Sequence, residues 1–125
     1  MLIRDWMTSS VISAKEDASM LKVSKLMQEH GIKRIPIVDD EMRLIGIVSD
    51  RDIKEASPSK ATTLDVHELS YLLSELKIKD IMTKNPVAVS SMDTIEQVAL
   101  IMLEKKLTGL PVVDWEKKLV GIITE

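Results

Sequence analysis

The chain has 125 residues, of which 45% are hydrophobic and 30% charged, with a net charge of −3 and no cysteine. This length suits one small domain or two very small units that share a core, and the lack of thiols excludes disulfides and thiolate chemistry. No basic face indicates nucleic-acid binding, and no apolar run approaches the roughly 18 residues of a membrane span, so we expect a cytoplasmic protein.

An internal repeat organises the sequence. Residues 1–50 align with residues 76–125 after a shift of 75 positions, without a gap. The matched residues are those that packing and turns require, such as Gly46 with Gly121. Each copy of such a repeat is one supersecondary unit that needs its neighbour to complete a core. We therefore expect a binding site to lie between the copies.

The first copy begins with a predicted strand at residues 11–13, followed by a helix. Ser19 is an N-cap residue before a helical stripe that runs through Val23 and Met27, and Gly31 supplies a stop. This pattern predicts an amphipathic helix between Ser19 and Gly31.

A β-hairpin is predicted after this helix. Apolar runs at residues 35–38 and 44–48 flank an acidic turn at 39–43, and both faces of such continuous strands should be covered. Pro36 cannot donate to a ladder, which places its strand at an edge or places Pro36 at the strand's start. A final helix is expected to begin near Ser49.

The connector between the copies is predicted to contain a packing helix. It turns polar at residues 57–60, and Asp65 then stands three positions before Glu68 in a capping arrangement. The leucines that follow at helical spacing are Leu69, Leu72, Leu73 and Leu76. They predict a helix with one apolar face rather than a loose tether.

The second copy repeats the order of the first. A strand is expected at residues 87–89, a helix capped by Asp93 or Thr94, and a hairpin around residues 114–118. The counterpart of the first copy's last helix would begin near Thr124, where the sequence ends.

We predict an α+β fold of two pseudo-symmetric β-α-β-β-α units packed through their small sheets, the second unit lacking its last helix. The predicted division places the first unit at residues 1–56, a linker with its helix at 57–75, and the second unit at 76–125.

The sequence predicts neither a metal site nor a catalytic set. His67 and Glu68 begin like a zinc-protease helix, but the position of the second histidine is Tyr71. Asp50 and Asp52 form an acidic pair without a third ligand nearby. These patterns favour a non-enzymatic protein.

Three motifs recur in both copies, represented by residues 79–87, 35–39 and 46–52. In this order they resemble a tandem CBS-domain protein, also called a Bateman module. The stretch from residue 46 to 58 more narrowly resembles the CBS portion of the acetoin-utilisation protein B group. The resemblance implies two clefts that hold adenosine-containing ligands such as AMP, ADP, ATP or S-adenosylmethionine. It implies no required cofactor, although Mg²⁺ can accompany a nucleotide.

The resemblance also implies roles for particular residues. In the family, a glycine followed by a hydroxyl residue and an aspartate contacts phosphate and ribose, so Ser49 would contact phosphate and Asp52 the ribose hydroxyls. The alternative interpretation is that Ser49 and Asp52 only cap a helix. Lys33 and Arg34 can offset phosphate charge, and they equally suit a solvated helix exit.

The candidate ligand-binding residues are Val11, Ile12, Ser13, Lys33, Arg34, Ile35, Pro36, Ser49, Asp52, Val87, Leu110, Pro111 and Thr124. Val11, Ile12 and Ile35 are the expected adenine walls. The second copy has no aspartate after Thr124 and no basic pair, so we expect one complete site, in the cleft of the first copy.

The leading hypothesis is a regulatory module that senses an adenosine-containing ligand between its units and biases an attached domain or a partner protein. Members of the resembled family usually form flat homodimers, so we also expect a homodimer. The alternative hypothesis is a structural dimerisation module with no ligand.

Overall fold

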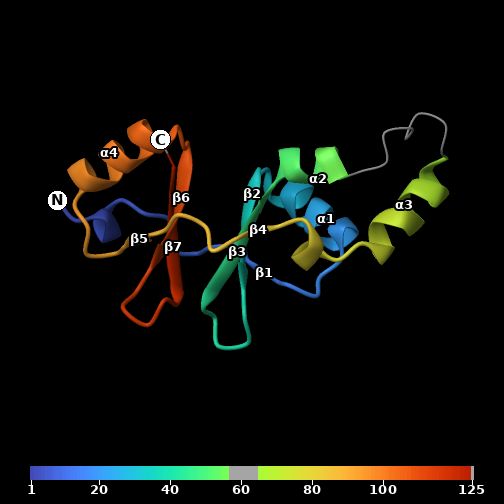
Figure 1. Cartoon of the computed structure of the whole chain (residues 1–125), viewed down its shortest axis with the longest axis horizontal. Helices are drawn as coiled ribbons and strands as arrows, with labels where there is room; N and C mark the ends of the chain where they lie inside the picture. Colours follow the sequence, from blue (N-terminus) through green and yellow to red (C-terminus); the bar gives the residue numbers. More distant parts are fainter. Residues whose placement is uncertain (57–64, 125) are drawn as a thin grey trace.

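The computed structural model describes residues 1–56 and 65–124, so the polar segment predicted at 57–60 lies outside the described residues. Its elements are η1 (Ile3–Asp5), β1 (Ala14–Lys15), α1 (Met20–His30), β2 (Arg34–Val38), β3 (Leu44–Ser49), α2 (Asp50–Ala56), α3 (Val66–Glu75), η3 (Ile78–Asp80), β4 (Thr83–Lys84), β5 (Val89–Ser90), α4 (Ile95–Lys105), β6 (Gly109–Val113) and β7 (Leu119–Thr124). One sheet has the order β1-β2-β3-β4 and the other β5-β6-β7. The predicted α+β class with two repeated units is confirmed (Figure 1).

The capping residues define the helix starts as the sequence predicts. The Ser19 side chain accepts a hydrogen bond from the backbone of Lys22, and Gly31 ends α1 with a φ of 62°. The Asp65 side chain accepts from the backbone of Glu68 and begins α3. Of the two candidate caps of α4, Thr94 forms a full capping box with Gln97.

The predicted first strands are displaced along the chain. Residues 11–13 form no strand, and β1 begins at Ala14 because parallel pairing with β2 is limited to Ile37 and Val38. This short pairing also explains Pro36. Although β2 is internal to its sheet, one flank of the strand has no partner at Pro36, so the missing amide donor costs no ladder bond there.

The opening residues of the chain cross to the second copy. Ile3 is 1% exposed and belongs to the apolar cluster of Val89, Val98 and Leu110. Its backbone N–H donates to the carbonyl oxygen of Asp93 at 2.8 Å. Figure 1 shows the dark blue N-terminal segment beside α4 and β5, the helix and first strand of the second copy.

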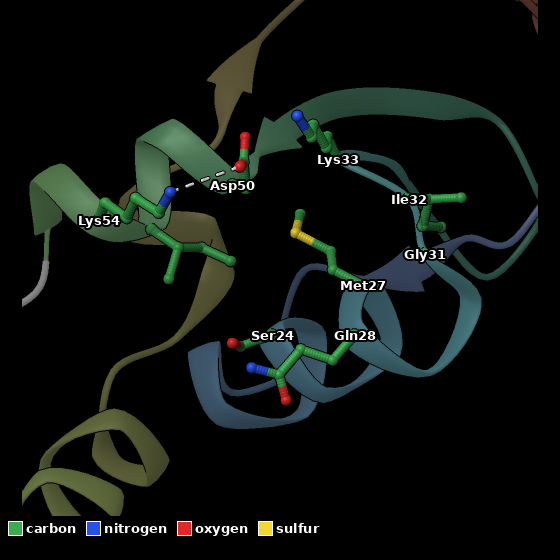
Figure 2. Close-up of a pocket in the computed structure, with 9 residues that line it drawn as sticks. Ser24, Met27, Gln28, Gly31, Ile32, Lys33, Asp50 and Lys54 are labelled. Atoms are coloured by element: carbon green, nitrogen blue, oxygen red, sulfur yellow. Dashed lines mark ion pairs between the residues drawn. The ribbon is translucent and has the colours of Figure 1, made fainter.

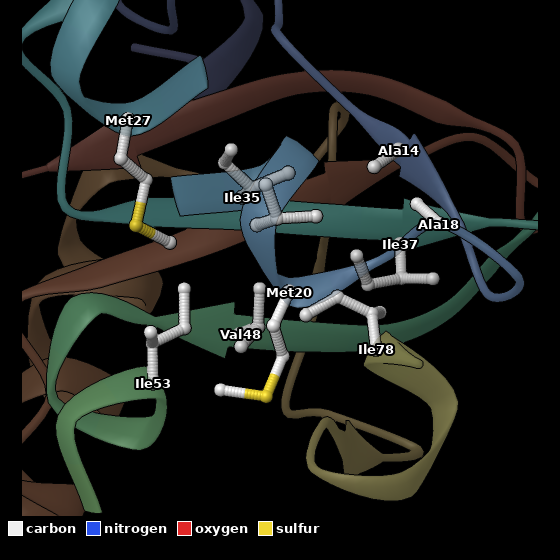
Figure 3. Close-up of a cluster of buried hydrophobic side chains, with 10 residues drawn as sticks. Ala14, Ala18, Met20, Met27, Ile35, Ile37, Val48, Ile53 and Ile78 are labelled. Carbon is white, nitrogen blue, oxygen red and sulfur yellow. The ribbon is translucent and has the colours of Figure 1, made fainter. Parts of the chain in front are cut away.

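The equivalent residues of the second copy cross in the opposite direction. Ile78 is fully buried in the first copy's cluster with Met20 and Ile37 (Figure 3). Its N–H donates to the Ala18 carbonyl oxygen at 2.8 Å. Strand β4 then pairs with β3 of the first copy. Each core is therefore completed by the other copy's first residues, which fixes the two sheets against each other.

The connector helix α3 packs on the same cluster through part of its leucine stripe. Leu73 and Leu76 lie partly buried against it, and the N–H of Met20 donates to the Leu76 carbonyl oxygen at 2.8 Å. Leu72 points outward and is 37% exposed. The predicted packing helix is thus present, with a narrower apolar face than its sequence indicates.

Aspartates close both hairpins. Asp39 Oδ1 accepts from the backbone N–H groups of Glu41 and Arg43, each at 2.9 Å. Asp114 closes the second hairpin in the same way. The hydrogen bond from the Arg43 backbone is the main cause that lowers the pKa of Asp39 from its usual value of 3.8.

This lowered pKa predicts a pH-dependent contribution to stability. Ionised Asp39 should stabilise the fold above pH 3.8, and the stabilisation should be lost as the pH falls through the lowered folded-state value. Asp39→Asn retains an acceptor oxygen but cannot titrate. The stability difference between the two proteins, measured by urea unfolding at several pH values, should therefore shrink in acid. A difference independent of pH would contradict this assignment.

Candidate functional site

Two pockets lie at the interface between the copies. The first cleft, of about 420 Å³, is lined by Thr8, Ser10, Val11, Ile12, Gly31, Ile32, Lys33, Arg34, Pro36, Ile122 and Thr124. The second cleft, of about 210 Å³, is lined by Arg34, Ile47, Ser49, Asp52, Thr83, Pro86, Val87, Leu107, Gly109, Leu110 and Pro111. Both clefts combine residues of the two copies.

The two clefts are equivalent under the sequence repeat. The shift of 75 positions that aligns the copies converts Thr8 to Thr83 and Pro36 to Pro111, and so relates the first cleft to the second. Each cleft takes its walls from one copy and the end of the hairpin's second strand from the other. This arrangement follows from the crossing of the N-terminal segments, which brings β3 and β7 beside the other copy.

The structure divides the predicted site residues between the clefts. Lys33 lines the first cleft together with the predicted residues Val11, Ile12, Pro36 and Thr124. The second cleft contains Ser49, Asp52, Val87, Leu110 and Pro111. The residues predicted to form one site in the first copy's cleft are therefore divided between two clefts, because the end of β3 faces the walls of the second copy.

Two predicted residues line neither cleft. Ile35 has no exposed surface, because alternation along β2 directs it into the core while Arg34 and Pro36 face the first cleft. Ser13 lies between the cleft residue Ile12 and the start of β1. The expected adenine wall at Ile35 is thus replaced by core packing.

Several lining residues were missed by reasoning from the sequence. They include Thr8, Ser10, Ile47, Thr83, Pro86, Leu107 and Ile122. The repeated Met-Thr pairs at residues 7–8 and 82–83 were a detectable signal. Their position in the clefts depends on the crossing of the first residues of each copy to the other copy. Thr8, for example, exchanges two backbone hydrogen bonds with Ile122 of the second copy, at 2.9 and 3.0 Å.

Ser49 and Asp52 form a reciprocal cap at the start of α2. The Asp52 N–H donates to Ser49 Oγ at 3.1 Å, and the Ser49 N–H donates to Asp52 Oδ2 at 2.9 Å. Both residues therefore cap α2, and their role in ligand binding stays a prediction. The cap uses only part of the hydrogen-bonding capacity of the Asp52 carboxylate, which has about four acceptor positions on its two oxygens. Asp52 can hold the helix start and still accept hydroxyl groups from a molecule in the second cleft.

The charged groups differ between the clefts. Lys33 and Arg34 give the first cleft two cations, whereas the second cleft combines Arg34 with the carboxylate of Asp52. The Arg34 guanidinium donates to Thr108 Oγ1 of the second copy. The first cleft thus presents excess positive charge, and the second is balanced.

A third pocket, of about 380 Å³, lies between α1 and α2 within the first copy (Figure 2). Met27 and Ile53 are among its lining residues, and an ion pair joins Asp50 to Lys54 at 3.8 Å. It meets the first cleft at the loop that contains Lys33. Across residues 1–56 and 65–124, no three His, Cys, Asp or Glu side chains are grouped to hold a metal, and no helix is long and apolar enough to cross a membrane.

Comparison with known proteins places this geometry in a family. A family model described as CBS domain matches residues 3–59 and 78–125. L-aspartate semialdehyde sulfurtransferase of Methanocaldococcus jannaschii is 29% identical over 98% of the chain, which spans only 21% of that enzyme. A CBS domain-containing protein of Dictyostelium discoideum is 28% identical over 98% of this chain and 85% of its own length.

Solved structures share the whole arrangement of both copies. A CBS domain pair in complex with 5′-methylthioadenosine and S-adenosyl-L-methionine has a TM-score of 0.79 and 28% identity over 99% of this chain and 89% of that one. For CBSX2 of Arabidopsis thaliana in complex with AMP, the TM-score is 0.80, with 33% identity over 99% and 90% of the two chains.

The narrower resemblance to the acetoin-utilisation group is supported as well. A putative acetoin utilisation protein of Vibrio cholerae has a TM-score of 0.82 and 30% identity over 99% of this chain and 84% of that one. Both copies of the repeat, the two sheets and the interface between them are thus accounted for by one architecture. The chain belongs to the CBS domain family, as a tandem pair of CBS units.

Proposed function

We propose that this chain is a regulatory module that binds adenosine-containing ligands in the clefts between its CBS units. The observation that carries the proposal is the second cleft, where Ser49 and Asp52 of one copy face Val87 and Pro111 of the other. The ligands of the solved neighbours, AMP, 5′-methylthioadenosine and S-adenosyl-L-methionine, support the ligand class. All three contain adenine and ribose.

The chemistry of each part of such a ligand matches a group in the clefts. Pro86, Val87 and Leu107 offer apolar surface to an adenine ring, and Asp52 offers acceptors to the ribose hydroxyls. In the first cleft, Val11 and Ile12 offer the corresponding apolar surface to the adenine ring. Lys33 and Arg34 supply charge for a phosphate there.

Ligand binding can be transmitted because each cleft is built from both copies. A ligand shifts the equilibrium between two arrangements of the units only by its difference in affinity for them, typically about 1–3 kcal/mol. The chain spans about a fifth of the length of the archaeal sulfurtransferase, at 21%. We propose that the output is an attached domain or a partner protein, in the cytoplasm, and that the module binds without catalysing a reaction.

The test compares the ligand affinity of Asp52→Ala with that of Asp65→Ala, a variant that loses a helix cap outside the clefts. Wild-type protein should melt at a higher temperature when AMP, ADP, ATP or S-adenosylmethionine is added, since a ligand of the folded form stabilises it. Asp52→Ala should weaken binding at the second cleft by about 1–3 kcal/mol, or roughly 5- to 150-fold, by calorimetry. Asp65→Ala removes the cap of α3 outside both clefts, so it should lower stability and leave affinity unchanged.

Two results would oppose the proposal. If no adenosine compound raises the melting temperature at millimolar concentration, the ligand-sensing function fails. If Asp52→Ala and Asp65→Ala affect affinity equally, Asp52 acts only as a cap.

The alternative, a structural dimerisation module, is favoured by one feature of α4. Leu100 and Leu103 are 54% and 77% exposed on this helix. We propose that the chain forms homodimers, with or without ligand. Light scattering of Leu103→Glu against the wild type would reveal whether this surface takes part, because a buried charge would dissociate the pair.

A further inference from the structure

One residue belongs to both clefts. Among the described residues, Arg34 is the only one that lines the first and the second cleft. It is the first residue of β2, paired in register with Ser49 at the end of β3. Its side chain leaves its own copy and reaches Thr108 of the other. Arg34 therefore stands where the two clefts meet.

The repeat supplies only one such side chain. The position equivalent to Arg34 in the second copy is Gly109, the first residue of β6. A Cβ atom at Gly109 would lie 3.5 Å from Arg34 Nη1 and 3.3 Å from the Thr124 methyl group. The Arg34 guanidinium thus lies beside Gly109, which supplies no cation of its own. Two equivalent clefts consequently share a single arginine.

The clefts do not depend on this arginine equally. The first cleft has Lys33 as a second cation. Among the described lining residues of the second cleft, Arg34 is the only cation, and Asp52 places a negative charge in the same pocket. A phosphate in the second cleft without Arg34 would meet only that carboxylate, and like charges at close range repel. Binding of phosphate there requires the guanidinium to face it.

Resting on the proposed function, we propose that Arg34 makes the two clefts antagonistic toward phosphorylated ligands. A nucleotide in the first cleft engages Arg34 and leaves the second cleft with Asp52 as its uncompensated charge. The second cleft then takes an adenosine compound without phosphate in preference to a nucleotide. Even a guanidinium that touched both phosphates would hold two dianions close together, so antagonism follows in either geometry.

Isoleucine methyl NMR on the full chain can follow each cleft separately. Ile12 and Ile122 report on the first cleft and Ile47 on the second. In the wild type, AMP should saturate the first cleft before the second, with half-saturation concentrations that differ by about tenfold or more. Adenosine added to protein already loaded with AMP should saturate the second cleft at the same concentration as it does in AMP-free protein.

Substitutions then separate the role of Arg34 from that of its neighbour. Arg34→Gln should weaken AMP more at the second cleft than at the first, because Lys33 remains in the first cleft and only the Asp52 carboxylate remains in the second. Lys33→Gln changes a cation that lines the first cleft and not the second. Lys33→Gln should weaken AMP binding at the first cleft. AMP bound in the first cleft should still raise the AMP concentration needed to half-saturate the second cleft, as followed at Ile47.

The outcomes distinguish this inference from the proposed function. Equal AMP affinities at both clefts of the wild type, or AMP binding that strengthens from one cleft to the other, would overturn the coupling and leave nucleotide binding intact. The same holds if Arg34→Gln weakens AMP equally at both clefts. No methyl shift with either AMP or adenosine would overturn the ligand-binding function itself, and the coupling with it. The wild-type comparison decides the matter even if the variant does not fold.

Discussion

Ile3→Ala is expected to lower the free energy of unfolding by about 2–5 kcal/mol, the range for a buried isoleucine cut to alanine. Ile3 is 1% exposed within the second copy's core. The measurement is urea unfolding followed by circular dichroism. Met1→Ala is the control, because Met1 is 73% exposed and its removal should cost less than about 0.5 kcal/mol.

The site of the lost stability tests whether the first residues of each copy pack on the other copy. Hydrogen exchange of Ile3→Ala should show lost protection in β6 and α4, and little change in α1. Ile78→Ala should produce the reverse pattern, because Ile78 is buried beside Met20 and Val23 of the first copy. Loss of protection within the substituted copy itself would contradict the exchange of segments.

Gly46→Ala is expected to destabilise the protein by about 1–3 kcal/mol, the cost of overpacking. A Cβ atom at Gly46 would lie 2.5 Å from Met82 Sδ and 3.1 Å from the Thr83 carbonyl oxygen. Glycine in a strand ordinarily costs stability relative to alanine, so a loss on substitution would identify the clash. The close approach at Gly46 is therefore with the crossing strand β4.

A double-mutant cycle separates the two contacts. Met82→Ala removes the sulfur, so the combined variant should lose less stability than the sum of the single changes. The remaining cost should come from the Thr83 carbonyl, which belongs to the backbone and cannot move aside. If the two losses of stability simply add, the Met82 sulfur does not clash with the new Cβ atom. Gly121 is the equivalent glycine, with Met7 in the place of Met82.

Local chemistry explains why the secondary structure could largely be predicted. Capping residues such as Ser19 and Asp65 satisfy backbone groups within a few positions of themselves, so their effect is encoded locally. The acidic turn at Asp39 works in the same way. Strand β1 escaped prediction because its length depends on how far β2 offers a partner, which is a property of the sheet.

The division of the site residues could not be predicted from either copy alone. Ile3 and Ile78 occupy equivalent positions in the repeat. The apolar pattern of the sequence is therefore the same whether each packs on its own copy or on the other copy. The same ambiguity hid that Asp52 and Lys33 face different clefts. The division into units at residues 1–56 and 76–125 stays a prediction, although the cores draw on both.

The exchanged segments also constrain the order of events during synthesis. Ile3 leaves the ribosome about 90 residues before Asp93, whose carbonyl oxygen accepts its backbone N–H. Until then the first copy can build its hairpin from local contacts but lacks Ile78, and the opening residues have no site to dock on. Long-range contacts of this kind delay folding, because the intervening loop must close before they contribute. The nascent chain therefore exposes Ile3 and half of each cleft until the second copy has been synthesised, and a chaperone can bind during that interval.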